Sequence, residues 1–206
     1  MRLCVYCGSN TGNAPEFAEA ARHLGSACAN RGIGLVYGGG SVGLMGIAAD
    51  AAMEAGGEVI GVITEQLVGA EVAHRGLTRL EVVPTMHERK ARLAELADGF
   101  VVLPGGFGTF DEFAEMLTWN QLGLVTKPVV VLDINGFWEP LLTWIDRAVD
   151  AGFLRPAHRM LAQRARTIDE AIAIASSPAP ETPHKWLDRD GTPAGGVTGQ
   201  LPIIRA

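Results

Sequence analysis

Short apolar runs alternate with longer helical patterns along most of the chain, and this alternation limits the fold more than any other feature. We expect strands at residues 3–6, 34–37, 59–64, 80–83, 100–103 and 128–132. We expect helices at 14–30, 43–55, 86–97, 110–122 and 137–151, with two shorter ones near 156–161 and 169–176. Asn13 followed by Glu16 resembles an N-terminal cap of the first helix. The alternation predicts an α/β fold with a parallel sheet and helices on both of its faces.

The predicted strands are apolar throughout, which is typical of strands that helices cover on both faces. We therefore predict one Rossmann-like domain over residues 1–176, built on a doubly wound sheet of mostly parallel strands. The chain has 206 residues, which fits a single domain. In open sheets of this class, ligands bind beyond the carboxyl ends of the strands, so the loops that follow strands are the places to search for a site.

Residues 177–206 differ from the rest of the chain. They hold 5 of the 11 prolines and show no helical or strand period. We interpret them as an extended Pro/Gly-rich C-terminal tail. The apolar patch at 201–204 favours docking of this tail on the domain or on a partner subunit.

Charge and composition exclude several classes of protein. The formal net charge is −6, whereas a nucleic-acid binder usually carries a basic surplus. No apolar run reaches the ~18 residues that a membrane span needs, and the chain starts with a strand pattern rather than a signal peptide. Cys4 and Cys7 have CxxC spacing, but on a strand residues i and i+3 face opposite sides. We expect a cytoplasmic protein without a disulfide framework.

Two glycine-rich clusters each follow a predicted strand and open a helix. The first reads YGGGSVGLMG at residues 37–46, and the second reads LPGGFGT at 103–109. Glycine lets the backbone approach a phosphate, and the unpaired N–H groups of a helix start bind its charge. The alternative is that these glycines only make tight turns and bind no ligand. Two clusters at equivalent places favour phosphate binding, with Gly39 and Gly40 as contacts in the first cluster.

The first cluster also matches GxGxxG through Gly38, Gly40 and Gly43, a pattern typical of dinucleotide sites. It follows the second predicted strand rather than the first, and Glu65 is a poor fit to the acidic residue that such sites use. No GxxxxGK[ST] sequence occurs, so a triphosphate-binding loop is not expected. An NAD-dependent oxidoreductase, which would bind a dinucleotide at this turn, is therefore a weaker alternative.

Arg89 falls on an otherwise apolar stripe of the helix at 86–97. Met86, Arg89, Leu93 and Leu96 recur at helical spacing, which places Arg89 on the inward face. Arginine is almost never buried without a partner, so Arg89 should meet a carboxylate, a phosphate or a ligand. A structural ion pair is the alternative. Lys90 lies on the flank of this stripe, where periodicity predicts a solvated side chain.

Glu112 lies three residues after Thr109, at the second glycine cluster. Thr-x-x-Glu is also a capping box, so a purely structural role is a serious alternative. If the loop holds a phosphate, however, Glu112 lies one helical turn from the sugar. We expect Asp111 to interact with the helix dipole and His87 to face solvent. No metal-binding spacing occurs, and no metal is predicted.

At these residues the sequence resembles the Lonely-guy (LOG) family of nucleoside 5′-monophosphate phosphoribohydrolases. The family signature PGGxGTxxE appears at residues 104–112, and MHxRKA appears at 86–91. The stretches YGGGxxGLMG at 37–46 and TWxQLG at 118–123 also match. The opening CGSN at 7–10 departs slightly from the family's CGSS. The resemblance covers roughly residues 2–175 and leaves the tail outside.

The resemblance implies the roles of individual residues. Arg89 and Glu112 would be the catalytic pair. The 5′-phosphate would be held by Gly105, Gly106, Gly108 and Thr109. Glu65, Lys90 and Thr118 match positions where the family contacts substrate.

The implied reaction is hydrolysis of the N-glycosidic bond of AMP or N6-prenylated AMP, which gives a free base and ribose 5-phosphate and activates a cytokinin. No cofactor is expected. The alternative is a non-catalytic nucleotide or molybdenum-cofactor carrier of the same fold, which needs the glycine turns but not the Arg89–Glu112 pair. Relatives have also been labelled lysine decarboxylases, but the three lysines offer no convincing pyridoxal-phosphate site. The family implies a homodimer, and the apolar helix at 110–122, with Phe113, Met116, Leu117 and Trp119, supports one.

Overall fold

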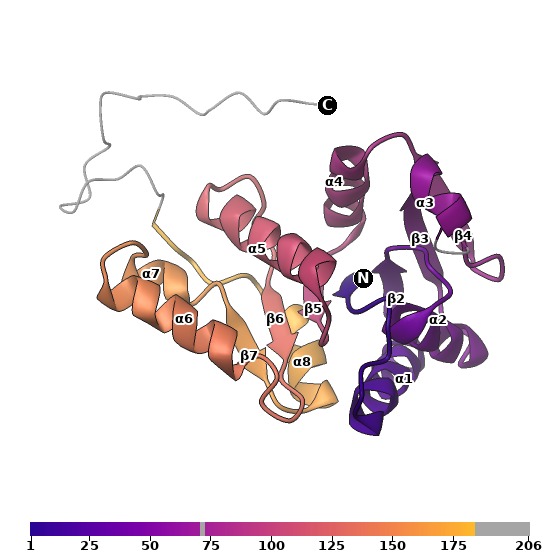
Figure 1. The fold of residues 1–206 in the computed structure, drawn as a ribbon, viewed down its shortest axis with the longest axis horizontal. Helices are drawn as coiled ribbons and strands as arrows, with labels where there is room; N and C mark the ends of the chain where they lie inside the picture. The colour runs from indigo at the N-terminus through magenta and orange to yellow at the C-terminus, as the bar shows by residue number, and fades with distance from the viewer. Residues whose placement is uncertain (71–72, 184–206) are drawn as a thin grey trace.

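The computed structural model describes residues 1–70 and 73–183, which form one parallel seven-stranded sheet with helices on both faces (Figure 1). Its strands are β1 (Arg2–Tyr6), β2 (Gly34–Tyr37), β3 (Val59–Thr64), β4 (Arg79–Val83), β5 (Gly99–Val102), β6 (Val129–Leu132) and β7 (Gln163–Ala165). Their order across the sheet is β4-β3-β2-β1-β5-β6-β7. The predicted α/β fold with a doubly wound parallel sheet is confirmed.

The helices are α1 (Pro15–Asn30), α2 (Gly43–Glu54), α3 (Glu65–Ala70), α4 (Met86–Leu96), α5 (Phe107–Gln121), α6 (Glu139–Asp150), α7 (Pro156–Arg159) and α8 (Ile168–Ala175). In the part of the chain that the structure describes, none of them is long and apolar enough to cross a lipid bilayer.

Two apolar clusters explain why the strands lack polar residues. Leu3 and Val5 of β1 face one cluster, which α1, α2 and α8 complete. Cys4 and Tyr6 face the other, which α4, α5 and α6 complete. Because successive side chains of a strand point to opposite faces, a sheet covered on both faces needs apolar residues at every position.

The direction in which the sheet grows reverses at β1. The chain builds β2, β3 and β4 outward from one edge of β1 and then returns to place β5 at the other edge. Helix α1, which follows β1, packs on one face, whereas α5, which follows β5, packs on the other. The carboxyl ends of β1 and β5 are therefore a topological switch point, where ligands bind in sheets of this class.

The structure corrects several expectations about local elements. Helix α1 has Ala14 as its N-cap without a side-chain cap, so the predicted Asn13 cap is wrong, and Pro15 opens the helix instead. Helix α5 begins at Phe107, three residues earlier than expected. The short elements α3 and β7 were not predicted. The tail is described only to Pro183, so the predicted docking of 201–204 lies outside the described residues.

Candidate active site

The loop after β1 joins the two glycine clusters into one site. The Gly8 amide donates a hydrogen bond to the carbonyl of Pro104 (3.0 Å), and the Gly8 carbonyl accepts one from the amide of Leu44 (3.0 Å). A Cβ atom at Gly43 would overlap the backbone of Ser9. The loops after β1, β2 and β5 thus contact one another at the carboxyl edge of the sheet.

In the second glycine cluster, packing requires a glycine at position 105 but not at positions 106 and 108. A Cβ atom at Gly105 would overlap the hydroxyl of Thr109, whose residue is only 4% exposed. Gly106 and Gly108, in contrast, have no atom within 4 Å of where a Cβ atom would lie. Gly106 is the N-cap of α5, so its open side adjoins the free N–H groups of the helix start, where phosphate groups bind.

In the first glycine cluster, packing against Arg89 or the backbone conformation requires glycine at two positions, and a third glycine pairs with another segment of the chain. A Cβ atom at Gly38 would overlap the guanidinium of Arg89. Gly39 has a φ of +77°, a conformation that favours glycine. Gly40 forms an isolated antiparallel bridge with Ala73. The cluster follows β2, and Arg89 fills the space in front of Gly38, which argues against a dinucleotide in this turn.

Arg89 is a buried arginine held by backbone carbonyls. Its side chain is 8% exposed. Its Nε donates to the carbonyl of Val62 (2.9 Å), and its Nη2 donates to the carbonyl of Gly38 (3.0 Å). These two bonds anchor the guanidinium at the carboxyl ends of β3 and β2. The inward direction predicted for Arg89 is confirmed.

Glu112 is the carboxylate that Arg89 meets. Arg89 Nη1 lies 3.5 Å from Glu112 Oε1, and the Glu112 side chain is 12% exposed. Because α5 has Gly106 as its N-cap and no side-chain cap, Thr109 and Glu112 do not form a capping box. The capping box of this region lies instead at the start of α4, between Thr85 and Glu88. The Arg89–Glu112 pair therefore lies between two helices, beside both glycine turns.

Lys90, the neighbour of Arg89, is buried rather than solvated, so the expectation from periodicity is wrong. Its Nζ lies 3.0 Å from Asp111 Oδ2 and 3.0 Å from Glu115 Oε1, and its side chain is 9% exposed. Burial lowers the pKa of Lys90, but the hydrogen bonds that its ammonium donates to Asp111 and Glu115 raise the pKa by more, so the net pKa is above its usual value. Lys90 is therefore an ammonium ion that links α4 to α5.

The other residues suggested by the resemblance lie farther from the pair. Glu65 is exposed at the first position of α3, directly after β3. Thr118 is exposed on α5, six residues and about 9 Å along the helix axis from Glu112. Its hydroxyl donates to the carbonyl of Ala114 (2.8 Å). Thr118 lines a groove between α5 and α6 and not the space beside Arg89.

His87, Cys4 and Cys7 do not belong to the Arg89–Glu112 pair. His87 is exposed, and burial raises the pKa of the thiols of Cys4 and Cys7. The two cysteines lie in the apolar clusters on opposite faces of the sheet. Within residues 1–70 and 73–183, no three His, Cys, Asp or Glu side chains are grouped as a metal site requires.

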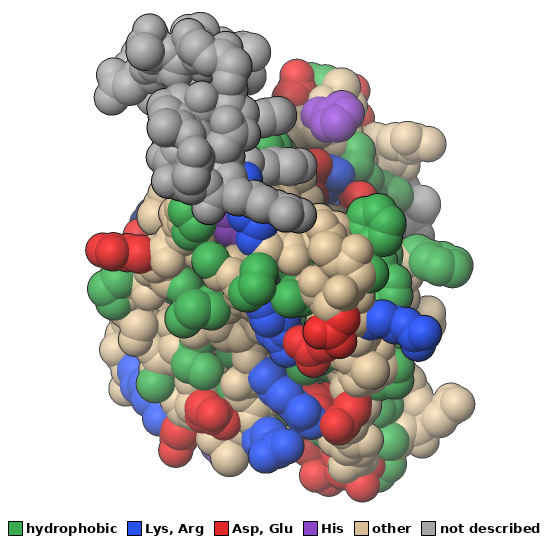
Figure 2. Space-filling view, turned by 90° about the vertical axis from the view of Figure 1, so that its left-hand side faces the viewer, with side chains coloured by type: hydrophobic (Ala, Val, Ile, Leu, Met, Phe, Trp, Pro, Cys, Tyr) green, Lys and Arg blue, Asp and Glu red, His purple; other side chains and the backbone are tan. Residues whose placement is uncertain are grey.

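An apolar groove of about 580 Å³ separates α5 from α6. Phe110 and Leu117 line it from α5, and Trp144 lines it from α6. Figure 2 looks at the side of the molecule where α6 and α7 lie and shows hydrophobic side chains at the surface among charged ones. Trp144 is 62% exposed and Phe153, at the rim of the groove, is 90% exposed. Phe113 and Met116, which we expected at this surface, lie in the core instead.

A family model and many curated relatives match most of the chain. A family model described as "Possible lysine decarboxylase" matches residues 45–174. The chain is 44% identical over 180 residues to a cytokinin riboside 5′-monophosphate phosphoribohydrolase of Arabidopsis thaliana, a match covering 87% of this chain and 83% of that protein. It is 47% identical over 177 residues to a protein of the same name from Rhodococcoides fascians, covering 85% of this chain and 89% of that protein.

Solved structures with the same fold include carriers of the molybdenum cofactor. The carrier protein of Chlamydomonas reinhardtii superposes with a TM-score of 0.63 at 26% identity, over 84% of this chain and 93% of that one. The molybdenum cofactor binding protein of Rippkaea orientalis gives a TM-score of 0.63 at 23% identity, over 84% of this chain and 93% of that one. The latter likeness shows the fold alone.

Proposed function

The chain belongs to the cytokinin riboside 5′-monophosphate phosphoribohydrolase family, and we propose that its Arg89–Glu112 pair hydrolyses the N-glycosidic bond of nucleoside 5′-monophosphates. It is a nucleotide N-glycosyl hydrolase of the class that its relatives represent. The products are a free base and ribose 5-phosphate. AMP and N6-prenylated AMP are the substrates that we propose, and a prenylated base would be an active cytokinin.

In this proposal the N-terminus of α5 binds the 5′-phosphate. The free N–H groups of the helix start lie beside Gly106 and Gly108, where no side chain blocks the approach, and the Thr109 hydroxyl lies against the adjacent Gly105. The phosphate then supplies binding energy that positions the ribose. Glu112 lies on the same helix, six residues and about 9 Å along its axis beyond Gly106, so a ribose held by its phosphate extends toward the Glu112 carboxylate.

Cleavage of the bond between C1′ and the base develops positive charge on the sugar. A carboxylate beside the ribose can stabilise that charge and accept a proton from the attacking water. The guanidinium of Arg89 orients the Glu112 carboxylate and is itself fixed by the carbonyls of Val62 and Gly38. The site therefore holds a carboxylate with a fixed direction without requiring a metal ion.

The observation that carries this proposal is the buried contact of Arg89 with Glu112 beside the glycine turns. A carrier of the same fold would need the turns alone, and carriers are the more distant relatives, at 26% identity for the Chlamydomonas reinhardtii protein. The test is incubation with AMP and with N6-prenylated AMP, followed by chromatography for free base. Tight AMP binding without release of any base would favour the carrier.

The description of the family model suggests a different reaction, which the described lysines do not fit. A lysine decarboxylase of the usual type holds pyridoxal phosphate on a lysine. The ammonium of Lys90 is held by two carboxylates. Lys127 donates a hydrogen bond to the carbonyl of Ala94 (2.6 Å). It precedes β6 and so lies at the amino ends of the strands, whereas the glycine turns lie at the carboxyl ends. Lys185 lies outside the described residues.

We also propose that the protein is a cytoplasmic homodimer whose subunits meet at the groove between α5 and α6. The three buried cysteines are free thiols, as expected in a reducing compartment. Large exposed aromatic side chains along one groove are typical of a protein–protein contact. The likeness to the family and the apolar lining of the groove both support a second copy of the chain as the partner.

A further inference from the structure

Helices α4 and α5 carry the two members of the catalytic pair, but they rest on different parts of the sheet. Helix α4 packs mainly over β3 and also over β1, β2 and β4, whereas α5 packs over β1 and β6, so β1 is the strand that they share. Figure 1 shows the two helices next to each other over the same face of the sheet. Their relative position therefore depends on the side chains that reach from one helix to the other.

Two consecutive residues of α4 reach across to α5. Arg89 contacts Glu112 at 3.5 Å. Lys90 contacts both Asp111 and Glu115, each at 3.0 Å. Asp111 and Glu115 are four residues apart, one helical turn, and Glu112 lies between them in the sequence. Lys90 thus holds both ends of the turn that presents Glu112.

Lys90 also balances negative charge that would otherwise disturb the site. Like charges at i, i+3 and i, i+4 repel on a helix, and α5 carries three carboxylates within five residues, at 111, 112 and 115. Glu115 is 16% exposed, and its Oε2 atom is buried without a hydrogen-bond partner among the described residues. Without Lys90, Glu115 would be a mostly buried carboxylate that has lost its cation.

We propose that Lys90 is a positioning residue, which fixes the α5 turn that carries Glu112 by holding and neutralising the carboxylates of Asp111 and Glu115 on either side of it. The inference rests on the proposed hydrolysis of nucleoside monophosphates and goes beyond it. It differs from the role that the resemblance implies, in which Lys90 contacts the substrate.

The test compares three variants by their kcat and KM for AMP. Lys90→Met should lower kcat by about 10-fold or more, because small displacements of catalytic groups are costly, while KM changes by less than about 3-fold. Lys90→Arg should restore most of kcat, because arginine can contact both carboxylates. Lys90→Met combined with Glu115→Gln should recover much of kcat, since it removes the buried charge of Glu115 together with its cation.

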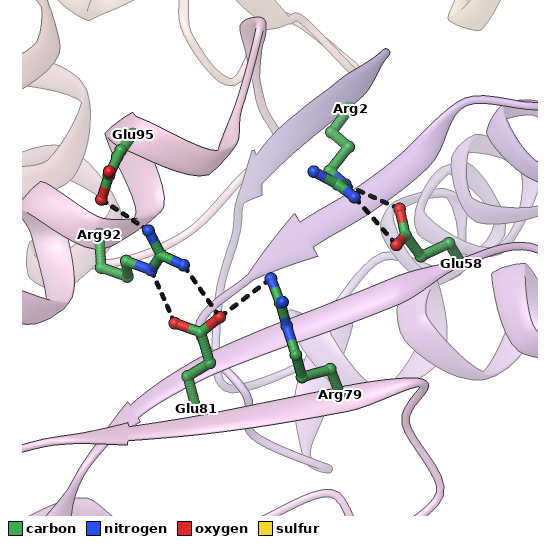
Figure 3. Close-up of polar contacts among 6 residues, drawn as sticks. All are labelled: Arg2, Glu58, Arg79, Glu81, Arg92 and Glu95. Atoms are coloured by element: carbon green, nitrogen blue, oxygen red, sulfur yellow. Dashed lines mark hydrogen bonds and ion pairs between the residues drawn. The ribbon is translucent and has the colours of Figure 1, made fainter.

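A matched control lies on the same helix. Arg92 of α4 contacts Glu81 of β4 (2.7 Å) and Glu95 (2.6 Å), as Figure 3 shows. This ion cluster has no contact with Arg89 or Glu112. Arg92→Met should lower the thermal midpoint of unfolding without changing kcat at a temperature where the variant is folded.

The outcomes separate this inference from the proposed function. Release of adenine by the wild type tests the proposed function by itself. If Lys90→Met raises KM by 10-fold or more at unchanged kcat, and Glu115→Gln gives no recovery, Lys90 contacts substrate and the inference is wrong. It is also wrong if Arg92→Met lowers kcat as much as Lys90→Met does. If Lys90→Met does not fold, the variant that combines it with Glu115→Gln is the test. A kcat near the wild-type value in that variant supports the inference, and a raised KM for AMP overturns it.

Discussion

The guanidinium of Arg89 lies 3.5 Å from the Glu112 carboxylate, although the two residues belong to different helices, α4 and α5, which share only β1 among the strands that they pack over. The carbonyl of Val62 in β3 and that of Gly38, directly after β2, both accept hydrogen bonds from Arg89. The carboxylate is thus directed by a cation that is itself fixed to the sheet. The pair is buried, and the desolvation of both charges offsets their mutual attraction, so stabilisation of the fold does not by itself account for it.

The two neighbouring glycines of the second turn should respond differently to alanine. Gly106→Ala should fold normally, because nothing lies within 4 Å of the new methyl group, but it should raise KM for AMP by roughly 10-fold, or about 1.4 kcal/mol. Gly105→Ala should lower stability by about 1–3 kcal/mol, because its methyl group overlaps Thr109. Denaturant unfolding and steady-state kinetics check both. Equal effects on stability would contradict the assignment of the phosphate site.

The 5′-phosphate should decide whether a nucleoside is a substrate. Loss of its contacts with the start of α5 should cost about 3 kcal/mol of binding energy, so kcat/KM for adenosine should be roughly 10²-fold below that for AMP. The measurement is release of adenine from both compounds under identical conditions. Comparable values would mean that the glycine turns do not bind phosphate.

Chelation of metal ions should leave the activity intact. The proposed site consists of a carboxylate, a guanidinium and backbone N–H groups, none of which needs a metal. Base release from AMP should proceed in EDTA at the same rate as without it. If activity disappears in chelator and returns with a divalent cation, the proposed chemistry is incomplete.

The groove between α5 and α6 should be the contact between subunits. Light scattering should give twice the mass of the chain for the wild type, and Trp144→Glu should shift the mass toward that of a monomer because a charge would be buried in an apolar contact. Val82→Glu is the control, since Val82 is 51% exposed on the edge strand β4, away from the groove. A wild type that is monomeric at working concentration would contradict the proposal.

The sequence predicts the main architecture because its signals are local. Apolar runs followed by helical patterns located six of the seven strands, and the stripe of α4 predicted the direction of Arg89. Strand β7 was missed because its three residues, Gln163–Ala165, show no apolar run and join the sheet only by pairing with β6. Helix α3 was missed because its six residues continue directly from β3.

Features that depend on distant parts of the chain could not be predicted. Lys90 looks solvated on its own helix and becomes buried only when α5 brings Asp111 and Glu115 to it. Thr109 and Glu112 match a capping box in sequence, but α5 begins at Phe107 and so turns Glu112 toward Arg89. The need for glycine at Gly38 likewise follows from Arg89, which lies 51 residues later in the sequence.

The central claim is that Glu112 acts in catalysis together with Arg89. Glu112→Gln keeps the size of the side chain and removes its charge. The Arg89→Ala variant and the double variant complete the set. Because the two residues act as a unit, the double variant should be little worse than either single one.

The most direct measurement is the rate of adenine release from AMP by folded Glu112→Gln, with folding checked by circular dichroism and AMP affinity measured by calorimetry. We predict a rate lower than that of the wild type by roughly 10²-fold or more, the contribution of a positioned acid–base group, with AMP affinity largely retained. A folded Glu112→Gln variant that releases adenine at nearly the wild-type rate would show that the Arg89–Glu112 contact is structural and that the proposed mechanism is wrong.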